Sequence, residues 1–315
     1  MMRKFALFCG SLACFVSPAA ASPSTPPRSQ PDDEILVVGQ RNPADAARDF
    51  VRSLALPSGN KQLARFYEPV CPYVAGLQDS SNALVVQRMR KVAAAAGMKV
   101  AKEPCKANAL LFVVRDKAKL LQAWLKSDSP LFGDEMSDGQ IINLIHDAAA
   151  ATSCQLLDYR GSDGRTMVKN RIARVGVPGE PLQVDISPDG ALENNWAPVS
   201  RIINPVQVGF GASVLVVDAH AAGGSDLRQL ADFAAMQLFA HTRPQTRIGQ
   251  PAPTILTLLD DASTGRAAPL SLTGWDLAYL KALYSYADRY SAGAERGDLA
   301  RRMSHYISNG APEGN

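Results

Sequence analysis

The side chains of this chain that could do catalytic chemistry are few and widely spaced. There are four histidines, and they are His146, His220, His241 and His305. A zinc site needs several histidine, cysteine or carboxylate ligands at helical or turn spacing, as in the His-Glu-x-x-His motif. No two of these histidines lie close enough in sequence to form a local ligand pair. We therefore expect no metal ion and no other cofactor.

The clearest group of polar residues lies at the end of a predicted strand. It consists of Asp218-Ala219-His220, just ahead of Gly223-Gly224-Ser225. Loops beyond strand ends often carry functional sites. A hydrolase could therefore draw its catalytic residues from Asp218, His220 and Asp232. Helix capping explains Ser225 and Asp226 without any catalytic role. We favour capping, and we keep the three residues as candidate catalytic residues.

A serine nucleophile of the G-x-S-x-G type has no clear place in the sequence. The nearest pattern is Gly209-Phe210-Gly211-Ala212-Ser213, in which the serine lies outside the central position and leads into a strand. Glycine within a strand commonly marks a bulge or a close approach of another group. We predict a bulge or a packing feature here.

The N-terminus has the pattern of a cleavable export signal. Met1-Met2-Arg3-Lys4 precedes an apolar stretch, and Ala19-x-Ala21 offers small side chains to a signal peptidase. Residues 1–21 are therefore predicted to be a signal peptide, with Ser22 as the first mature residue. The alternatives are a membrane anchor, which polar residues and Pro18 interrupt, and a lipid attached to Cys14. No later segment approaches membrane length without charge, so we expect a periplasmic or secreted protein without a transmembrane span.

Cysteine usage agrees with export. The mature chain would keep Cys71, Cys105 and Cys154, which allows one disulfide and one free thiol in an oxidising compartment. Cys71 and Cys105 each lie at or just ahead of a predicted strand start, where two strands entering one sheet come within bridging distance. We predict a Cys71–Cys105 disulfide and a buried Cys154. Three unpaired buried thiols are the alternative.

The composition is that of an ordinary globular protein, with 46% hydrophobic and 20% charged residues. The net charge is +3, and loss of Arg3 and Lys4 with the signal would lower it to +1. Nucleic-acid binding needs a basic excess or a basic face. Basic clusters such as Arg301-Arg302 lie on predicted helices, so we read them as solvated faces and expect no nucleic-acid partner.

The first half of the mature chain alternates between predicted strands and helices. A flexible leader over 22–34, rich in proline, serine and charge, precedes a short strand over 35–39. Apolar spacing and caps predict helices from Pro43, over 80–96, after Asp116 and after Ser137. Apolar runs predict strands over 70–77 and 109–114. This half should be a helix-covered sheet.

The second half begins with strand patterns and ends with helices. Turn residues over 161–164 predict a hairpin that pairs 155–159 with 166–175. Further strands are predicted over 182–186 and 206–217, and helices over 225–241, after Thr273 and around Met303. The fold class is therefore α/β or α+β, one mixed sheet with flanking helices. We expect a single domain over 35–315, with a possible sub-boundary near residue 150.

The order of elements in the C-terminal third resembles the back half of a metzincin-type zinc peptidase domain. A long strand and the helix over 225–241 are followed by Thr254-Ile255-Leu256 and by Leu272-Thr273-x-x-Asp276-x-x-x-Leu280-x-x-Leu283-Tyr284. The last pattern is similar to the closing helix of that family. The family's zinc helix carries His-Glu-x-x-His, whereas this helix has Gln229 and Phe233 at the histidine spacing. The resemblance implies a metzincin-like scaffold that lacks its metal.

Two further segments resemble envelope proteins. The stretch from Cys71 through Leu111 is similar in pattern to uncharacterised bacterial exported proteins. Residues 33–41, with the sequence DEILVVGQR, resemble the segment near the mature N-terminus of TonB-dependent outer-membrane receptors. The long helical stretches exclude the receptor fold itself, so this second resemblance implies at most a shared envelope partner. A plain edge strand after a flexible leader is the alternative.

These observations favour an exported, non-enzymatic binding or interaction protein on a degenerate peptidase-like scaffold. Its partner would be an envelope protein or a small molecule. The rival is a periplasmic hydrolase whose site residues converge from distant loops. An enzyme should have a polar pocket beside His220, and a binding module should have an exposed apolar patch or a free strand edge.

Overall fold

The structure is a computed structural model that describes residues 42–56, 62–127, 132, 136–161, 172–177, 180–185, 206–242, 252–265, 267–285 and 292–309. The predicted signal peptide, the predicted leader and the predicted strand over 35–39 lie outside these residues. Residues 41–315 form one compact unit.

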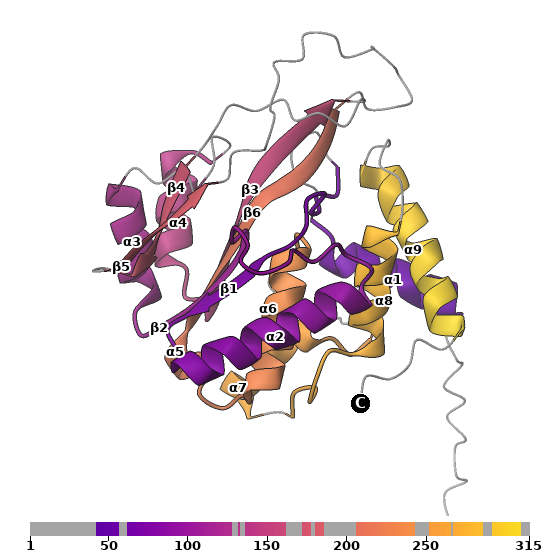
Figure 1. Cartoon of the computed structure of the whole chain (residues 1–315). Coiled ribbons are helices and arrows are strands. Elements are labelled where there is room, and N and C mark those ends of the chain that lie inside the picture. The colour runs from indigo at the N-terminus through magenta and orange to yellow at the C-terminus, as the bar shows by residue number, and fades with distance from the viewer. Residues whose placement is uncertain are drawn as a thin grey trace, which may run out of the picture. The chain divides into compact units, whose positions relative to one another are not determined.

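A four-stranded mixed sheet lies at the centre of this unit (Figure 1). Its order is β1 (Pro72–Ala75), β2 (Ala109–Val114), β6 (Val206–Asp218) and β3 (Ala151–Gly161). The first three strands are parallel, and β3 runs antiparallel to β6. The predicted mixed sheet with flanking helices is therefore confirmed. Since β1, β2 and β6 are parallel, their carboxyl ends and the start of β3 meet at one edge of the sheet.

Helices cover the sheet, and a separate two-stranded hairpin is formed by β4 (Ile172–Val177) and β5 (Glu180–Asp185). The described helices are α1 (Pro43–Leu54), α2 (Asp79–Ala95), α3 (Lys117–Lys126), α4 (Asp138–His146), α5 (Ala219–Ala222), α6 (Leu227–Phe239), α7 (Leu258–Thr264), α8 (Gly274–Tyr284) and α9 (Ala292–Ser308), with a 3-10 turn η3 over Ile255–Thr257. Several begin at side-chain caps. The capping boxes of α4 and α8 start at Ser137 and Thr273, as their sequences predict.

Alternating side chains of the strands enter two separate cores. Leu111 of β2 and Leu215 of β6 face the larger core, which α1, α2, α6, α8 and α9 help to build. Phe112 and Val214 face the smaller core beneath α3 and α4. The period of two along each strand therefore divides the apolar residues between two helical layers.

Three sequence-based predictions about local structure are wrong. Residues 155–159 belong to β3, which pairs along its whole length with β6. Of the predicted partner segment 166–175, residues 172–175 are described, and they belong to β4, which pairs with β5 instead. Ser225 is not the cap of α6; Asp226 is, and its carboxylate accepts a hydrogen bond from the Gln229 amide. The apolar spacing after Asp116 also predicts that Leu125 lies on the buried face of its helix, whereas Leu125 of α3 is 39% exposed.

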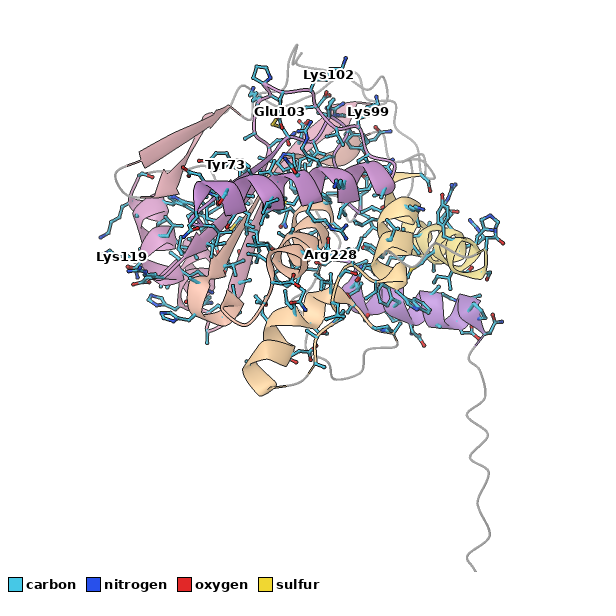
Figure 2. The ribbon with its side chains drawn as sticks, turned by 60° about the horizontal axis from the view of Figure 1, so that its bottom comes forward. Tyr73, Lys99, Lys102, Glu103, Lys119 and Arg228 are labelled. Carbon is cyan, nitrogen blue, oxygen red and sulfur yellow. A yellow bond between two sulfur atoms is a disulfide. The ribbon has the colours of Figure 1, made fainter. Side chains whose placement is uncertain are left out.

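The predicted disulfide is present. Cys71 and Cys105 are bonded, with their Cα atoms 6.1 Å apart. Cys71 immediately precedes β1, and Cys105 lies in the loop that leads into the adjacent parallel strand β2. The bond holds the loop between α2 and β2, on which Lys99, Lys102 and Glu103 are labelled in Figure 2. Cys154 is buried and unpaired, as predicted, and its burial raises the pKa of the thiol to about 12.

The glycine-rich stretch at the middle of β6 is a bulge, as predicted. Ala212 pairs with Leu156 and Phe210 pairs with Leu157, so that Gly211 is the extra residue. Gly209 permits a close packing contact as well, because a Cβ atom there would lie 2.5 Å from the Tyr67 ring. The pattern therefore serves the sheet rather than a nucleophile.

Candidate functional site: a cavity at the edge of the sheet

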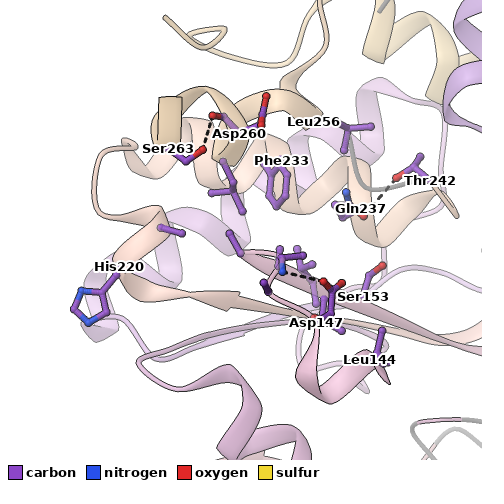
Figure 3. A pocket seen from close by; sticks show the side chains of 18 of the residues that line it. Leu144, Asp147, Ser153, His220, Phe233, Gln237, Thr242, Leu256, Asp260 and Ser263 are labelled. Carbon is purple, nitrogen blue, oxygen red and sulfur yellow. Dashed lines mark hydrogen bonds between the residues drawn. The ribbon is translucent and has the colours of Figure 1, made fainter. Parts of the chain in front are cut away.

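A cavity of about 610 Å³ lies at the edge where the parallel strands end. It is bordered by the loop from α4 into β3, by α5, by α6 and by α7 (Figure 3). In α/β sheets, ligands bind outside the carboxyl ends of the strands, because the connecting loops there leave a crevice. The position of this cavity therefore makes it the leading candidate site.

Most of the cavity wall is apolar. Leu215 provides part of the floor, and Phe233, Leu256 and Leu259 come from α6, η3 and α7; each of the four is less than 9% exposed. Alanines 148–151 form the opposite wall together with Leu144. A wall of this kind takes up the hydrocarbon part of a small molecule.

The polar groups around the cavity are largely engaged by the protein itself. One oxygen of Asp147 accepts the Ala149 amide at 3.1 Å, and the Ser263 hydroxyl donates to the Asp260 carbonyl at 2.8 Å. The Thr242 hydroxyl lies 3.4 Å from the side-chain oxygen of Gln237, to which it donates. Figure 3 shows these contacts on different walls. They shape the cavity and do not form a chain of proton transfer.

The α4–β3 wall is fastened from behind by a buried lysine. The ammonium of Lys117 donates to the carbonyls of Asp147 and Ala149 at 2.9 and 2.7 Å, and to the Thr152 hydroxyl at 2.8 Å. Lys117 is only 7% exposed, and desolvation lowers the pKa of its ammonium. Three oxygen acceptors compensate the buried charge and fix the wall segment over 147–152.

His241, which follows the C-cap of α6, also lines the cavity. Burial lowers the pKa of this imidazole from 6.5 to about 4. A general base works best when its pKa is close to the working pH. His241 is therefore neutral at neutral pH and is a weak proton acceptor there.

Two of the three predicted catalytic residues lie near the cavity, but they do not face each other. Asp218 caps α5, and one carboxylate oxygen accepts the backbone amides of His220 and Ala221 at 2.8 and 3.3 Å. His220 lies at the rim, exposed, with its ring directed away from the cavity in Figure 3. The carboxylate therefore orients the helix backbone and not the imidazole.

The third candidate, Asp232, lies elsewhere. It is fully buried on α6 and pairs with Arg88 of α2 through two bonds of 2.6 and 2.9 Å. The Leu272 amide donates to the same carboxylate at 2.7 Å. Asp232 thus joins three segments, and it does not line the cavity.

Sequence reasoning missed several residues that line the cavity, among them Asp147, Ser153, His241 and Asp260. Asp147 and Ser153 flank the start of β3, so the rule that sites lie at strand ends could have drawn attention to them. His241 follows α6 and Asp260 lies on α7, and no local pattern connects the two residues.

Within the described ranges, no three histidine, cysteine or carboxylate side chains are grouped so as to hold a metal ion. The helices in those ranges are also too short or too polar to cross a membrane. Comparison with protein-family models, curated protein sequences and solved structures found no match to this chain.

Proposed function

We propose that this chain is an exported, non-catalytic binding protein that takes a small molecule with a mostly apolar body into the cavity. The observation that carries the proposal is the cavity itself, about 610 Å³ with an apolar wall and few polar groups. Binding sites for small molecules commonly measure roughly 300–1,000 Å³ and have this kind of lining.

The rival function, a hydrolase, has less support. Its expected residues Asp218 and His220 do not point toward each other, and Asp232 is engaged by Arg88. A pocket does lie beside His220, but its wall is mainly apolar. The resemblance to a metal-free peptidase scaffold agrees with a binding role, because Phe233 lies at one histidine position and borders the cavity.

The proposal includes export through a signal peptide over residues 1–21. Support comes from the charged and apolar pattern of that segment and from the Cys71–Cys105 disulfide, since disulfides persist in oxidising compartments. The intact mass of protein recovered from the envelope fraction should correspond to a chain that begins at Ser22. A mass that retains residues 1–21, or that carries lipid on Cys14, would contradict this part.

Binding can be tested with the fluorescent probe N-phenyl-1-naphthylamine, whose emission rises in an apolar site. Wild-type protein should bind the probe saturably. Ala148→Trp, which adds bulk on the cavity wall, should weaken binding, whereas Ala94→Trp on the exposed face of α2 should not. Equal binding by both variants, or no saturable binding by wild type, would overturn the proposal.

A further inference from the structure

Helix α6 carries a buried run over residues 230–239, in which two side chains, Asp232 and Gln237, are polar. A polar side chain in such a run costs free energy unless its hydrogen-bonding groups find partners. Asp232 finds them in Arg88 and in the Leu272 amide. Gln237 is bonded far less completely, although its exposed fraction is only 6%.

The side-chain amide of Gln237 can accept two hydrogen bonds through its oxygen and donate two through its nitrogen. Among the residues that the structure describes, this amide has one partner, the Thr242 hydroxyl, which donates to the oxygen over 3.4 Å. That distance is long for such a hydrogen bond. The two N–H groups of the amide therefore keep their donor capacity.

This donor capacity lies beside the cavity. Gln237 lines the cavity from α6, and Ser153 lines it from β3 on the facing wall (Figure 3). Phe233, one helical turn before Gln237, adds an aromatic ring to the same wall. A hydrogen bond formed against such a largely apolar wall is stronger than the same bond in water. A ligand in the cavity thus meets a buried amide donor next to an apolar surface.

We infer that the ligand carries an uncharged oxygen acceptor of the carbonyl type, as in a ketone, an ester or an amide, and that the side-chain amide of Gln237 donates a hydrogen bond to it. The inference rests on the proposed binding function and names the ligand class for the same cavity. A neutral donor offsets the desolvation of a carbonyl oxygen, whereas an ion loses far more hydration than one amide returns.

The test uses three ligands with the same naphthalene body, 2-acetylnaphthalene, 2-isopropenylnaphthalene and 2-naphthoate. Each is titrated at neutral pH as a competitor of the fluorescent probe. The first two have nearly the same shape, because a C=CH2 group replaces the C=O group. Wild-type protein should bind the ketone about threefold to tenfold more tightly than the alkene, the range that a net hydrogen bond provides. 2-Naphthoate should bind more weakly than the ketone.

Gln237→Leu removes the donor and keeps a side chain of similar size. The variant should remain folded, because it leaves only the Thr242 hydroxyl without its partner. It should abolish the preference for the ketone over the alkene without weakening alkene binding. Gln87→Leu, the same substitution at an exposed position of α2, is the matched control and should keep the wild-type preference.

Three results would overturn the inference while the binding proposal stands. The first is equal or tighter binding of the alkene or of 2-naphthoate by wild-type protein, a comparison that needs no variant. The second is an unchanged ketone preference in Gln237→Leu. The third is an equal loss of affinity for all three ligands in Gln237→Leu, which would indicate a purely structural role. If neither the three ligands nor the fluorescent probe binds wild-type protein, the proposed function itself fails.

Discussion

Helix α6 borders two regions that differ in how their polar groups are bonded. Toward α2, the fully buried Asp232 carboxylate accepts two bonds from Arg88 and one from the Leu272 amide. Toward the start of β3, Phe233 and Gln237 of the same helix face a cavity of about 610 Å³. The first region joins helices, and the second leaves room for another molecule.

The comparison separates a carboxylate that holds segments of the chain together from one that lines a cavity. A buried carboxylate whose acceptors are satisfied by the chain costs stability when its partner is lost, but it has nothing left to offer a ligand. Asp147, which lines the cavity, is exposed, and its side chain accepts one backbone amide of its own loop, that of Ala149. Residue type does not distinguish Asp232 from Asp147, because both are aspartates. Their burial and their hydrogen-bond partners do distinguish them.

The largest expected effect on stability concerns the ion pair between Asp232 of α6 and Arg88 of α2. Asp232→Ala should lower the free energy of unfolding by about 3–5 kcal/mol, because it leaves Arg88 and the Leu272 amide without their acceptor. Urea denaturation measures the loss. The double variant Asp232→Leu with Arg88→Met should recover most of it, since no unpaired charge remains. A loss below about 1 kcal/mol in Asp232→Ala would show that the pair is not structural.

The next effect concerns the wall of the cavity. Lys117→Met should lower the free energy of unfolding by about 2–3 kcal/mol, because two backbone carbonyls and the Thr152 hydroxyl lose their donor. The exposed Lys119, two residues away and labelled in Figure 2, provides the matched control Lys119→Met, which should change stability by less than about 0.5 kcal/mol. Equal effects of the two substitutions in urea denaturation would contradict the role of Lys117.

The buried imidazole of His241, which lines the cavity, should make the free energy of unfolding depend on pH. The pKa of His241 is about 4 in the folded chain and 6.5 as its ordinary value. Between these values the unfolded chain binds the proton and the folded chain does not, so stability falls as pH decreases from 6.5 to 4. The full contribution is up to about 3 kcal/mol. His241→Gln should flatten the curve in this window, and His305→Gln on exposed α9 should not; identical curves for His241→Gln and wild type would count against the shift.

The smallest expected effect on stability concerns a buried polar group of the sheet, the Ser213 hydroxyl of β6. Ser213 is fully buried, and its hydroxyl has no hydrogen-bond partner. Replacing an unsatisfied buried hydroxyl by a methyl group removes a desolvation cost. Ser213→Ala should therefore raise the free energy of unfolding by about 0.5–1 kcal/mol. A measurable loss of stability would indicate that the Ser213 hydroxyl does form a hydrogen bond in the folded protein.

Short-range rules were sufficient for much of the fold. The capping boxes at Ser137 and Thr273 and the apolar run of β2 depend on neighbours within a few residues, and each lies where the sequence places it. The Cys71–Cys105 bond followed from compartment and from strand starts. The hairpin prediction failed because turn residues over 161–164 indicate only a change of chain direction. They do not indicate which strand pairs with β3.

The sequence by itself indicated most of the longer helices and strands, the mixed class of the sheet and the favoured cysteine pair, because these depend on local propensity, periodicity and the chemistry of three cysteines. It did not indicate α5 or α7. Only the tertiary structure decided the partner of β3, the engagement of Asp232 by Arg88, 144 residues away, and the meeting of Asp147, His241 and Asp260 around one cavity. Such contacts form between segments far apart in the chain, and their energies come from packing and desolvation that no short window of sequence contains.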